Sequence, residues 1–345
     1  MKNEMPLPNY ADVLSAARQI TGGAWETPLI ENEELNTRAG VRVLLKLETL
    51  QRTGSFKVRG AFNRVSRISA QESPGGIVAY SGGNHAQGAA YAAAVGGMPA
   101  LIMMPSDAPT SKIERTRRYG AEIEFYPRED SHLRVERAEQ LASEREATVV
   151  PSYDDFHVIA GQGTVGLEIF HTVAQQGVVL DGLVVPCSGG GLTAGCALAT
   201  RALSPSTKIY AVEPYGFDDT ARSIAAGQLL ENAPGGVSIC DALLISPPGV
   251  KTFSINRHNV DAGLCVTDRE VAFAMLFAFE HLKIIVEPGG AVGLAAVLFG
   301  KIPDDAKTVA VVLTGGNIDL DRFNKIVKQQ SSSVCDSPFQ LTIRP

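Results

Sequence analysis

The sequence lacks any run of about 18 apolar residues, the length that a membrane-spanning helix needs. Its first residues, 1–6, place no apolar core behind a basic segment, so they do not resemble a signal peptide. Positive charge is also in deficit, with 31 Lys and Arg against 37 Asp and Glu and a net charge of -6. Because binding to nucleic-acid phosphates needs a basic surface, we expect neither nucleic acid nor a membrane as a partner.

Cysteine and histidine patterns are equally sparse. The five cysteines form no Cys-x-x-Cys pair, and an odd number without metal spacing is typical of reduced thiols in a cytoplasmic protein. The six histidines form no His-Glu-x-x-His cluster, which argues against catalytic zinc. What remains is a chain of 345 residues, 45% apolar and 20% charged, with the length of about two ordinary domains.

Short β-rich apolar runs alternate with Ala-rich helical stretches along the chain. A predicted strand at 76–80 precedes a helix at 86–95, and a strand at 182–186 precedes a helix at 192–203. This alternation predicts an α/β fold with parallel sheets covered by helices, whose ligands bind at the carboxyl ends of the strands. Further strands are predicted at 41–47, 99–104, 122–126, 208–212 and 307–313, and further helices at 111–119, 268–282 and 290–298.

A glycine-rich loop at 185–195, V-P-C-S-G-G-G-L-T-A-G, follows a predicted strand and opens a helix. Consecutive glycines let backbone amides approach an anion, and the helix N-terminus adds partial positive charge, so the loop predicts a phosphate site. No Gly-Lys-Ser/Thr follows, which excludes a P-loop. Glu213 lies roughly 20 residues farther on, where a dinucleotide-binding fold carries an acidic residue, so a dinucleotide site stays open. The glycine spacing is G-x-G-x-x-x-G, however, and not the dinucleotide pattern G-x-G-x-x-G. A tight turn without a ligand is the other alternative.

Lys57 lies among glycines in the run T-G-S-F-K-V-R-G at 53–60, just before the apolar-periodic segment 61–65. It therefore lies near a helix start, where the macrodipole disfavours a protonated amine. A lysine that forms a Schiff base must be neutral to attack an aldehyde. Taken alone, however, this run is better explained by a solvated surface lysine.

Two more glycine loops follow predicted strands. In S-G-G-N-H-A-Q-G at 81–88, the amides and the Asn84 side chain could hold a carboxylate or a phenolic oxygen, or the run is a capped turn. His85 in it is interpreted as a packed histidine rather than a general base. In L-T-G-G-N-I-D at 313–319, Thr314 could meet a ring nitrogen, or the segment is a plain helix cap.

Taken together, these runs resemble the fold-type II enzymes that use pyridoxal 5'-phosphate (PLP), and within them the threonine/serine dehydratase and serine racemase branch. The resemblance covers about residues 27–320, and it also rests on I-A-G-Q-G-T at 159–164 and V-E-P-G-G-A-V-G-L-A-A from Val286. It implies a tryptophan synthase β-like fold, with two doubly wound parallel-sheet domains and the cofactor between them. The implied parts are a large PLP-binding domain of residues 1–66 plus 153–328, a small domain of residues 67–152 and a mobile tail of residues 329–345.

The resemblance implies a role for each matching position. Lys57 would carry the cofactor as a Schiff base and act as the base at the substrate Cα. Phe56 would pack on the pyridine ring, Asn84 would bind its phenolic oxygen and Thr314 would face its nitrogen. Glu287 would lie near the cofactor. The phosphate would be held by backbone amides of Ser188, Gly189, Gly190, Gly191 and Leu192, and the substrate by Ser81, Gly82, Asn84 and His85. Ser188 stands where relatives often carry glycine.

Two of these positions favour elimination. A neutral Thr314 hydroxyl does not keep the ring nitrogen protonated, so the ring is a weaker electron sink and a leaving group at Cβ helps discharge the carbanion. Racemases of this branch carry a serine at the position of Gly82, on the cofactor face opposite the lysine. We therefore expect a catabolic dehydratase that converts a 3-hydroxy amino acid such as threonine or serine to a 2-oxo acid and ammonia.

The resemblance also implies a cation site and a homodimer. The segment E-P-Y-G-F-D-D at 213–219 matches the place where relatives bind magnesium or calcium, and the implied ligands are Glu213, Asp219 and the Phe217 carbonyl. The alternative is a helix-entry loop with capping aspartates.

The substrate side chain beyond Cβ is not specified by these motifs. The segment 238–249 departs from the most familiar threonine dehydratases, so hydroxyaspartate, phenylserine or another unusual 3-hydroxy amino acid stays open. Three other hypotheses are a racemase or β-replacement enzyme, a dinucleotide-dependent oxidoreductase built on the Gly189 loop, and a ligand-binding protein without activity.

Overall fold

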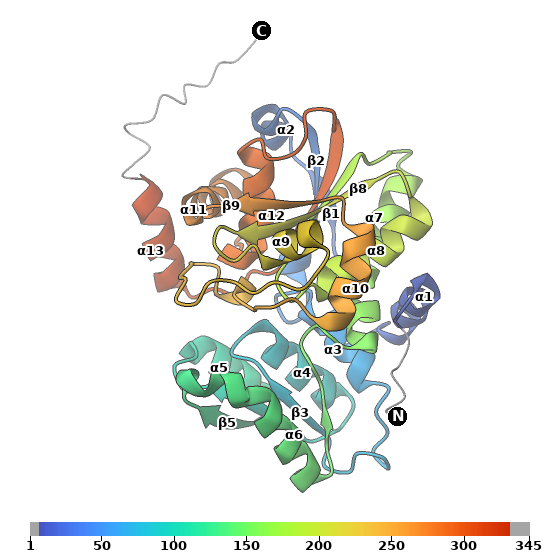
Figure 1. The fold of residues 1–345 in the computed structure, drawn as a ribbon, viewed down its shortest axis with the longest axis vertical. Coiled ribbons are helices and arrows are strands. Elements are labelled where there is room, and N and C mark those ends of the chain that lie inside the picture. Colours follow the sequence, from blue (N-terminus) through green and yellow to red (C-terminus); the bar gives the residue numbers. More distant parts are fainter. Residues whose placement is uncertain (1–6, 332–345) are drawn as a thin grey trace.

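A computed structural model describes residues 7–331 of the chain and contains two sheets (Figure 1). The larger has the strand order β1-β2-β10-β7-β8-β9 and the smaller has the order β5-β4-β3-β6. The strands are β1 (Leu29–Glu31), β2 (Arg42–Leu47), β3 (Ile77–Tyr80), β4 (Ala100–Pro105), β5 (Glu122–Tyr126), β6 (Thr148–Val149), β7 (Gly182–Pro186), β8 (Lys208–Pro214), β9 (Ala262–Val266) and β10 (Thr308–Leu313).

Helices precede, connect and follow these strands. The α-helices are α1 (Tyr10–Gln19), α2 (Glu33–Ala39), α3 (Lys57–Val65), α4 (Asn84–Val95), α5 (Thr110–Arg118), α6 (Arg134–Arg145), α7 (Phe156–Gln175), α8 (Gly191–Leu203), α9 (Asp219–Ala226), α10 (Val250–Asn259), α11 (Asp268–Phe277), α12 (Pro288–Leu298) and α13 (Leu320–Ser331). Short helical turns are η1 (Glu48–Leu50), η2 (Arg128–Leu133), η3 (Asp241–Leu243) and the π-helical turn η4 (Ala278–Leu282).

The sheets are parallel as expected, with one departure among the described strands. β1 pairs antiparallel with β2, with Leu29 opposite Lys46. The connection 32–41 is shorter than the crossover of about a dozen residues that a parallel neighbour needs. The predicted helix at 268–282 is also split, because α11 ends at Phe277 and continues as the π-helical turn η4.

Helix α7 packs closely against both α3 and α8, and its glycines explain how. A Cβ on Gly161 would lie 2.7 Å from the Gly60 Cα of α3, and a Cβ on Gly163 would lie 2.8 Å from the Gly195 carbonyl oxygen of α8. Cβ atoms do not approach other atoms this closely, so only glycine allows these two crossings. The run at 159–164 therefore brings the helix of Lys57 and the helix of the glycine-rich loop onto one support.

The C-terminal helix corrects one prediction. Helix α13 ends at Ser331, so residues 329–331 are helical although the tail was predicted to begin at 329. Phe323, Ile326 and Val327 are buried against the core of the large sheet, and this packing stabilises the helix that continues beyond them. Residues 332–345 of the predicted tail lie outside the described residues. The domain boundaries at 66/67 and 152/153 stay predictions.

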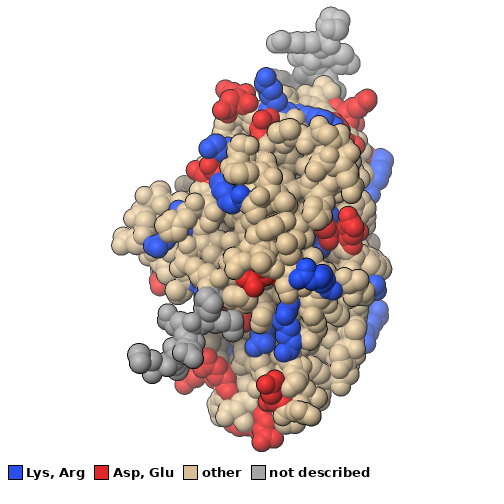
Figure 2. Space-filling model, turned by 90° about the vertical axis from the view of Figure 1, so that its right-hand side faces the viewer, with Lys and Arg blue, Asp and Glu red and all other residues tan. Residues whose placement is uncertain are grey.

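Within residues 7–331 no helix is both long and apolar enough to cross a membrane. On the face of the molecule shown in Figure 2, acidic and basic side chains are interspersed among uncharged ones.

Candidate active site

A cavity of about 470 Å³ lies between the two sheets and is lined by residues from both sides. All four predicted loops reach it: three directly follow the carboxyl end of a strand, and the loop before Lys57 follows β2 after the turn η1. Its lining includes the predicted residues Phe56, Lys57, Ser81, Gly82, Asn84, His85, Ser188, Gly189, Gly190, Gly191, Leu192 and Thr314. The structure thus brings together residues that lie more than 250 positions apart in the sequence.

Among the helices that begin at this cavity are α3, α4, α8 and α12. None of the four has a side chain that caps its first turn. The unsatisfied N–H groups and the partial positive charge of each helix N-terminus are therefore directed toward the cavity wall. This arrangement suits a ligand that carries several anionic groups.

Lys57 is the first residue of α3, and its Nζ donates a hydrogen bond to the Ser152 carbonyl oxygen at 2.9 Å. Burial lowers the pKa of Lys57 to about 8. The same Nζ lies 5.2 Å from the centroid of the Phe56 ring. More of this amine is therefore neutral near pH 7 than in a solvated lysine, and a lysine that attacks an aldehyde requires the neutral form.

The loop before Lys57 is joined to the loop after β10. The Phe56 N–H donates to the Thr314 carbonyl oxygen at 3.1 Å, and the Gly316 N–H donates to the Gly54 carbonyl oxygen at 2.9 Å. These bonds place Thr314, which is buried, beside the start of α3. The two predicted loops form one continuous wall of the cavity.

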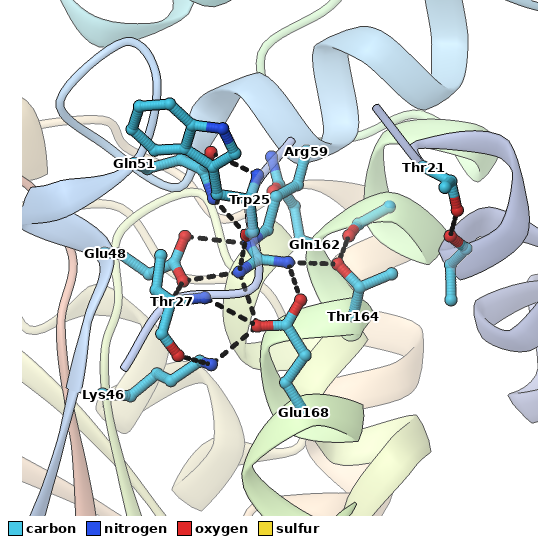
Figure 3. Close-up of polar contacts among 12 residues, drawn as sticks. Thr21, Trp25, Thr27, Lys46, Glu48, Gln51, Arg59, Gln162, Thr164 and Glu168 are labelled. Carbon is cyan, nitrogen blue, oxygen red and sulfur yellow. Dashed lines mark hydrogen bonds and ion pairs between the residues drawn. The ribbon is translucent and has the colours of Figure 1, made fainter. Parts of the chain in front are cut away.

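A buried ion cluster anchors the first turn of α3 (Figure 3). Arg59 donates to Glu48 of η1 at 2.8 and 2.7 Å and to Glu168 of α7 at 2.5 and 2.8 Å. Lys46 of β2 donates to the same Glu168 at 2.6 Å. Two cations and two carboxylates balance, which removes most of the cost of burying each charge. The helix of Lys57 is thereby fixed to the large sheet.

The glycine-rich loop leaves no space for side chains. A Cβ on Gly189 would lie 2.5 Å from the Tyr153 ring, and Gly190 has a φ of 89° with Asn256 Nδ2 at 2.7 Å from a Cβ. Backbone amides, rather than side chains, therefore face the cavity here. The Ser188 hydroxyl, the departure from glycine, accepts a hydrogen bond from the Ile245 N–H at 3.3 Å.

A chain of side-chain hydrogen bonds passes through Asn84. Asn84 Nδ2 donates to Glu287 Oε1 at 2.5 Å, and Asn84 Oδ1 accepts from Asn317 Nδ2 at 2.8 Å. One N–H of the Asn84 amide remains for a ligand atom. Burial raises the pKa of Glu287 to about 7.

In the loop at 81–88, the side chains of Ser81 and His85 form hydrogen bonds with the backbone. The Ser81 hydroxyl accepts a hydrogen bond from the Gly83 N–H at 3.1 Å. His85 is buried, and its Nε2 bonds to the Val150 carbonyl at 2.8 Å. Burial first, and then the Lys57 charge, lower the pKa of His85 to about 4. This histidine is therefore neutral and packed into the loop, as interpreted from the sequence.

At the predicted cation site, Glu213 and Asp219 are both buried. Among residues 7–331 no group of three or more His, Cys, Asp and Glu side chains is arranged to hold a metal ion. Glu213 instead accepts hydrogen bonds from the N–H groups of Thr220 and Ala221 at 3.2 and 2.9 Å, in the first turn of α9. The structure is therefore closer to the alternative of a helix-entry loop. The capping group is Glu213, however, and not an aspartate.

The sequence motifs missed several residues that line the cavity. Lys112, Arg128 and Arg134 add cationic side chains from the small sheet, and Tyr153 packs on the glycine-rich loop. No local pattern distinguishes these residues from solvated charges. Asn317 lies in the loop 313–319, where only Thr314 was singled out, and its spacing after the glycines was the available signal.

Comparisons with known proteins agree with this geometry. The family model described as "Pyridoxal-phosphate dependent enzyme" matches residues 20–315. The L-threo-3-hydroxyaspartate ammonia-lyase of Pseudomonas sp is 42% identical and covers 94% of this chain and 100% of its own length. The enzyme of the same name from Saccharomyces cerevisiae is 41% identical and covers 94% of this chain and 97% of its own length.

Solved structures give the same result. Maize serine racemase superposes with a TM-score of 0.87 at 32% identity and covers 96% of this chain and 100% of the racemase chain. Three findings agree with one another. A family model matches most of the chain, two relatives are more than 40% identical to it over nearly its full length, and the fold is the same as that of a solved relative. The chain belongs to the family of pyridoxal-phosphate-dependent enzymes.

Proposed function

We propose that this protein is a PLP-dependent ammonia-lyase that converts a 3-hydroxy amino acid to a 2-oxo acid and ammonia by α,β-elimination. One observation carries the proposal. A buried lysine whose pKa is lowered to about 8 lies in the same cavity as an uncapped glycine-rich helix start. The two features are those that an aldehyde and a phosphate on one small molecule require.

The residues present fit PLP. The loop 188–192 offers backbone amides, and a side chain would clash at its three glycines, 189–191, which suits the phosphate. Lys57 offers its amine, and Asn84 has one N–H left for the phenolic oxygen. When bound, PLP withdraws electrons from the Cα of an amino acid joined to it.

The side chains of this chain then have defined tasks. The Lys57 amine, once neutral, removes the proton from the substrate Cα. The Asn84 amide, held by Glu287 and Asn317, keeps a fixed donor toward the ring. The Thr314 hydroxyl would face the ring nitrogen of PLP without fixing a proton on it. These roles are proposals that the geometry supports.

An acidic substrate side chain is favoured over threonine or serine. Lys112 and Arg134 line the cavity, and Lys112 Nζ lies 3.4 Å from Asp241. Arg134 lines the cavity together with the rings of Tyr80 and Tyr153. A second carboxylate would be attracted to this side of the cavity. The names of the Pseudomonas and Saccharomyces relatives support 3-hydroxyaspartate as the substrate.

Racemisation is the second candidate, because relatives named serine racemase are 35–38% identical. A racemase needs a group that can return a proton to the face opposite the lysine. Gly82 has no side chain to do so, and a Cβ there would lie 3.1 Å from Pro105 Cδ. Elimination is therefore favoured.

The experiment measures ammonia and 2-oxo acid release from purified protein. The substrate panel includes the stereoisomers of 3-hydroxyaspartate, threonine and serine. We expect a visible absorption band from bound cofactor, its loss in Lys57→Ala, and the highest kcat/KM with an isomer of 3-hydroxyaspartate. A protein without this band, or with a band but no ammonia from any isomer, is not the enzyme proposed.

A divalent cation, a homodimer and a cytoplasmic location are further proposals. The cation is supported by two neighbouring buried carboxylates, Glu213 and Asp219, because the Asp219 charge adds to burial in raising the pKa of Glu213. Thermal unfolding with and without a chelator tests the cation, and sedimentation tests the dimer.

A further inference from the structure

Helix α5 of the small sheet contacts the loops of the large sheet at three points beside the cavity. The Ser111 hydroxyl donates to Asp319, Lys112 Nζ lies 3.4 Å from Asp241, and Arg115 Nη1 donates to Asn317 Oδ1 at 2.6 Å. The three residues lie on one side of α5, at spacings of one, three and four. The contact of Arg115 differs from the others because its acceptor, Asn317, is itself hydrogen-bonded to Asn84 of the candidate site.

Asn317 connects three groups by hydrogen bonds. Its Oδ1 accepts from Arg115, and its Nδ2 donates to the Thr53 carbonyl oxygen and to Asn84 Oδ1, both at 2.8 Å. It is 5% exposed and packs so closely on Gly54 that a Cβ there would lie 2.4 Å from Asn317 Oδ1. All of its hydrogen-bonding atoms are therefore occupied, and its amide has one orientation.

The chain of bonds has a direction. It begins at a cation, Arg115, continues through the amides of Asn317 and Asn84, and ends at the carboxylate of Glu287. Each amide accepts on one side and donates on the other, so the bonds polarise one another in the same sense. The result is that Asn84 presents N–H rather than C=O toward the cavity.

The chain also crosses between the two sheets. Arg115 and Asn84 belong to the helices of the small sheet, whereas Asn317, Thr53 and Glu287 belong to the loops of the large sheet. These bonds form only when the two sheets have the relative placement seen here. The bond from Arg115 is charge-assisted and sits at the outer end of the chain.

We propose that Arg115 is a positioning residue: acting through Asn317, it holds the Asn84 amide in its donating orientation when the two sheets close on the cavity. The proposal rests on the proposed PLP function, because Asn84 acts on the reaction only if a cofactor oxygen lies beside it. Arg115 does not itself line the cavity.

The experiment compares Arg115→Ala and Arg115→Lys with Arg118→Ala in the holoenzyme. Arg118 lies on the same helix, is exposed and has no role in the chain of bonds, so its variant is the matched control. The readouts are the absorption maximum of the bound cofactor, kcat and KM, and the melting temperature. Arg115→Gln serves as a second variant if Arg115→Ala does not fold.

We expect Arg115→Ala to lower kcat on the order of tenfold, which is the loss of one charge-assisted hydrogen bond. The absorption maximum should shift as well, and Arg115→Lys should recover part of both effects. In an Asn317→Ala background, the further change from Arg115→Ala should disappear, because the two residues act through one bond.

The inference is overturned if Arg115→Ala matches Arg118→Ala in kcat and absorption maximum. It is equally overturned if the effect of Arg115→Ala is undiminished in the Asn317→Ala background. A wild-type protein without the visible band instead overturns the proposed function, so the two failures are distinguishable.

Discussion

The amine of Lys57 donates a hydrogen bond to the carbonyl oxygen of Ser152 at 2.9 Å. This bond links the first residue of α3 to the segment that leads into α7, the helix that supports both α3 and α8. Burial keeps the pKa of the amine near 8, and a carbonyl oxygen can accept from either of its protonation states. The amine is thus held in place and is ready to lose its proton.

Replacing Glu287 changes how stability depends on pH. Burial raises the pKa of its carboxyl group from 4.5 to about 7, so between these values the folded protein binds more protons than the unfolded chain. Stability contributed by this group therefore falls as pH rises through that window. Glu287→Gln removes the buried charge and should raise the free energy of unfolding at pH 8, on the order of 2 kcal/mol, with little change near pH 4. Urea unfolding at both pH values measures this, with the exposed Glu114→Gln as control.

Removing Arg59 should destabilise the fold strongly. Its guanidinium and the Glu48 carboxylate are both fully buried and lie 2.7 Å apart. Arg59→Met leaves that carboxylate without its partner, and breaking a buried pair costs about 3–5 kcal/mol. The exposed pair Arg42–Glu31, at 2.8 Å, provides the control, because Arg42→Met should cost less than about 1 kcal/mol. Equal losses in the two variants, measured by urea unfolding, would contradict a stabilising role for the buried cluster.

Arg134 should determine the preference for an acidic substrate. Arg134→Ala is expected to lower kcat/KM for 3-hydroxyaspartate by about 10- to 100-fold, which is the loss of a charge-assisted contact. The value for serine should change little, because serine has no second carboxylate. Arg137→Ala is the control, since Arg137 lies on the same helix and pairs with Glu124 at 3.1 Å. A parallel loss for both substrates would mean that Arg134 supports the fold or the cofactor instead.

Gly82→Ser should add racemisation at the expense of elimination. The new hydroxyl would supply the proton donor that the glycine lacks. The Cβ would lie 3.1 Å from Pro105 Cδ, so the proline must move by a few tenths of an ångström and some activity will be lost. Gly82→Ala has the same crowding without the hydroxyl and isolates that loss. Chiral chromatography of serine after incubation measures racemisation in each variant. If the wild-type protein racemises serine as fast as it eliminates water from it, the absence of a side chain at Gly82 does not prevent racemisation.

Some elements whose ends are marked by glycine were predictable, whereas others were missed. Strand β7 and helix α4 lie within two residues of their predicted bounds, because apolar runs bounded by glycines mark both. Helix α7 was missed although it has 20 residues, since it is buried around nearly its whole circumference and shows no amphipathic stripe. Strand β9 (Ala262–Val266) was missed because Gly263 lies in its interior, whereas the glycine of β7 is its first residue.

The sequence by itself determined the family, the glycine loops and Lys57, because these depend on local backbone requirements that only certain residues meet. The tertiary structure alone decided which side chains contact one another. Arg59 meets Glu168 across 109 positions and Arg115 meets Asn317 across 202. The cations Lys112 and Arg134 became part of the cavity only when the small sheet was placed against the large one. Such contacts follow from how helices and sheets pack, and packing is a property of the whole chain rather than of any segment.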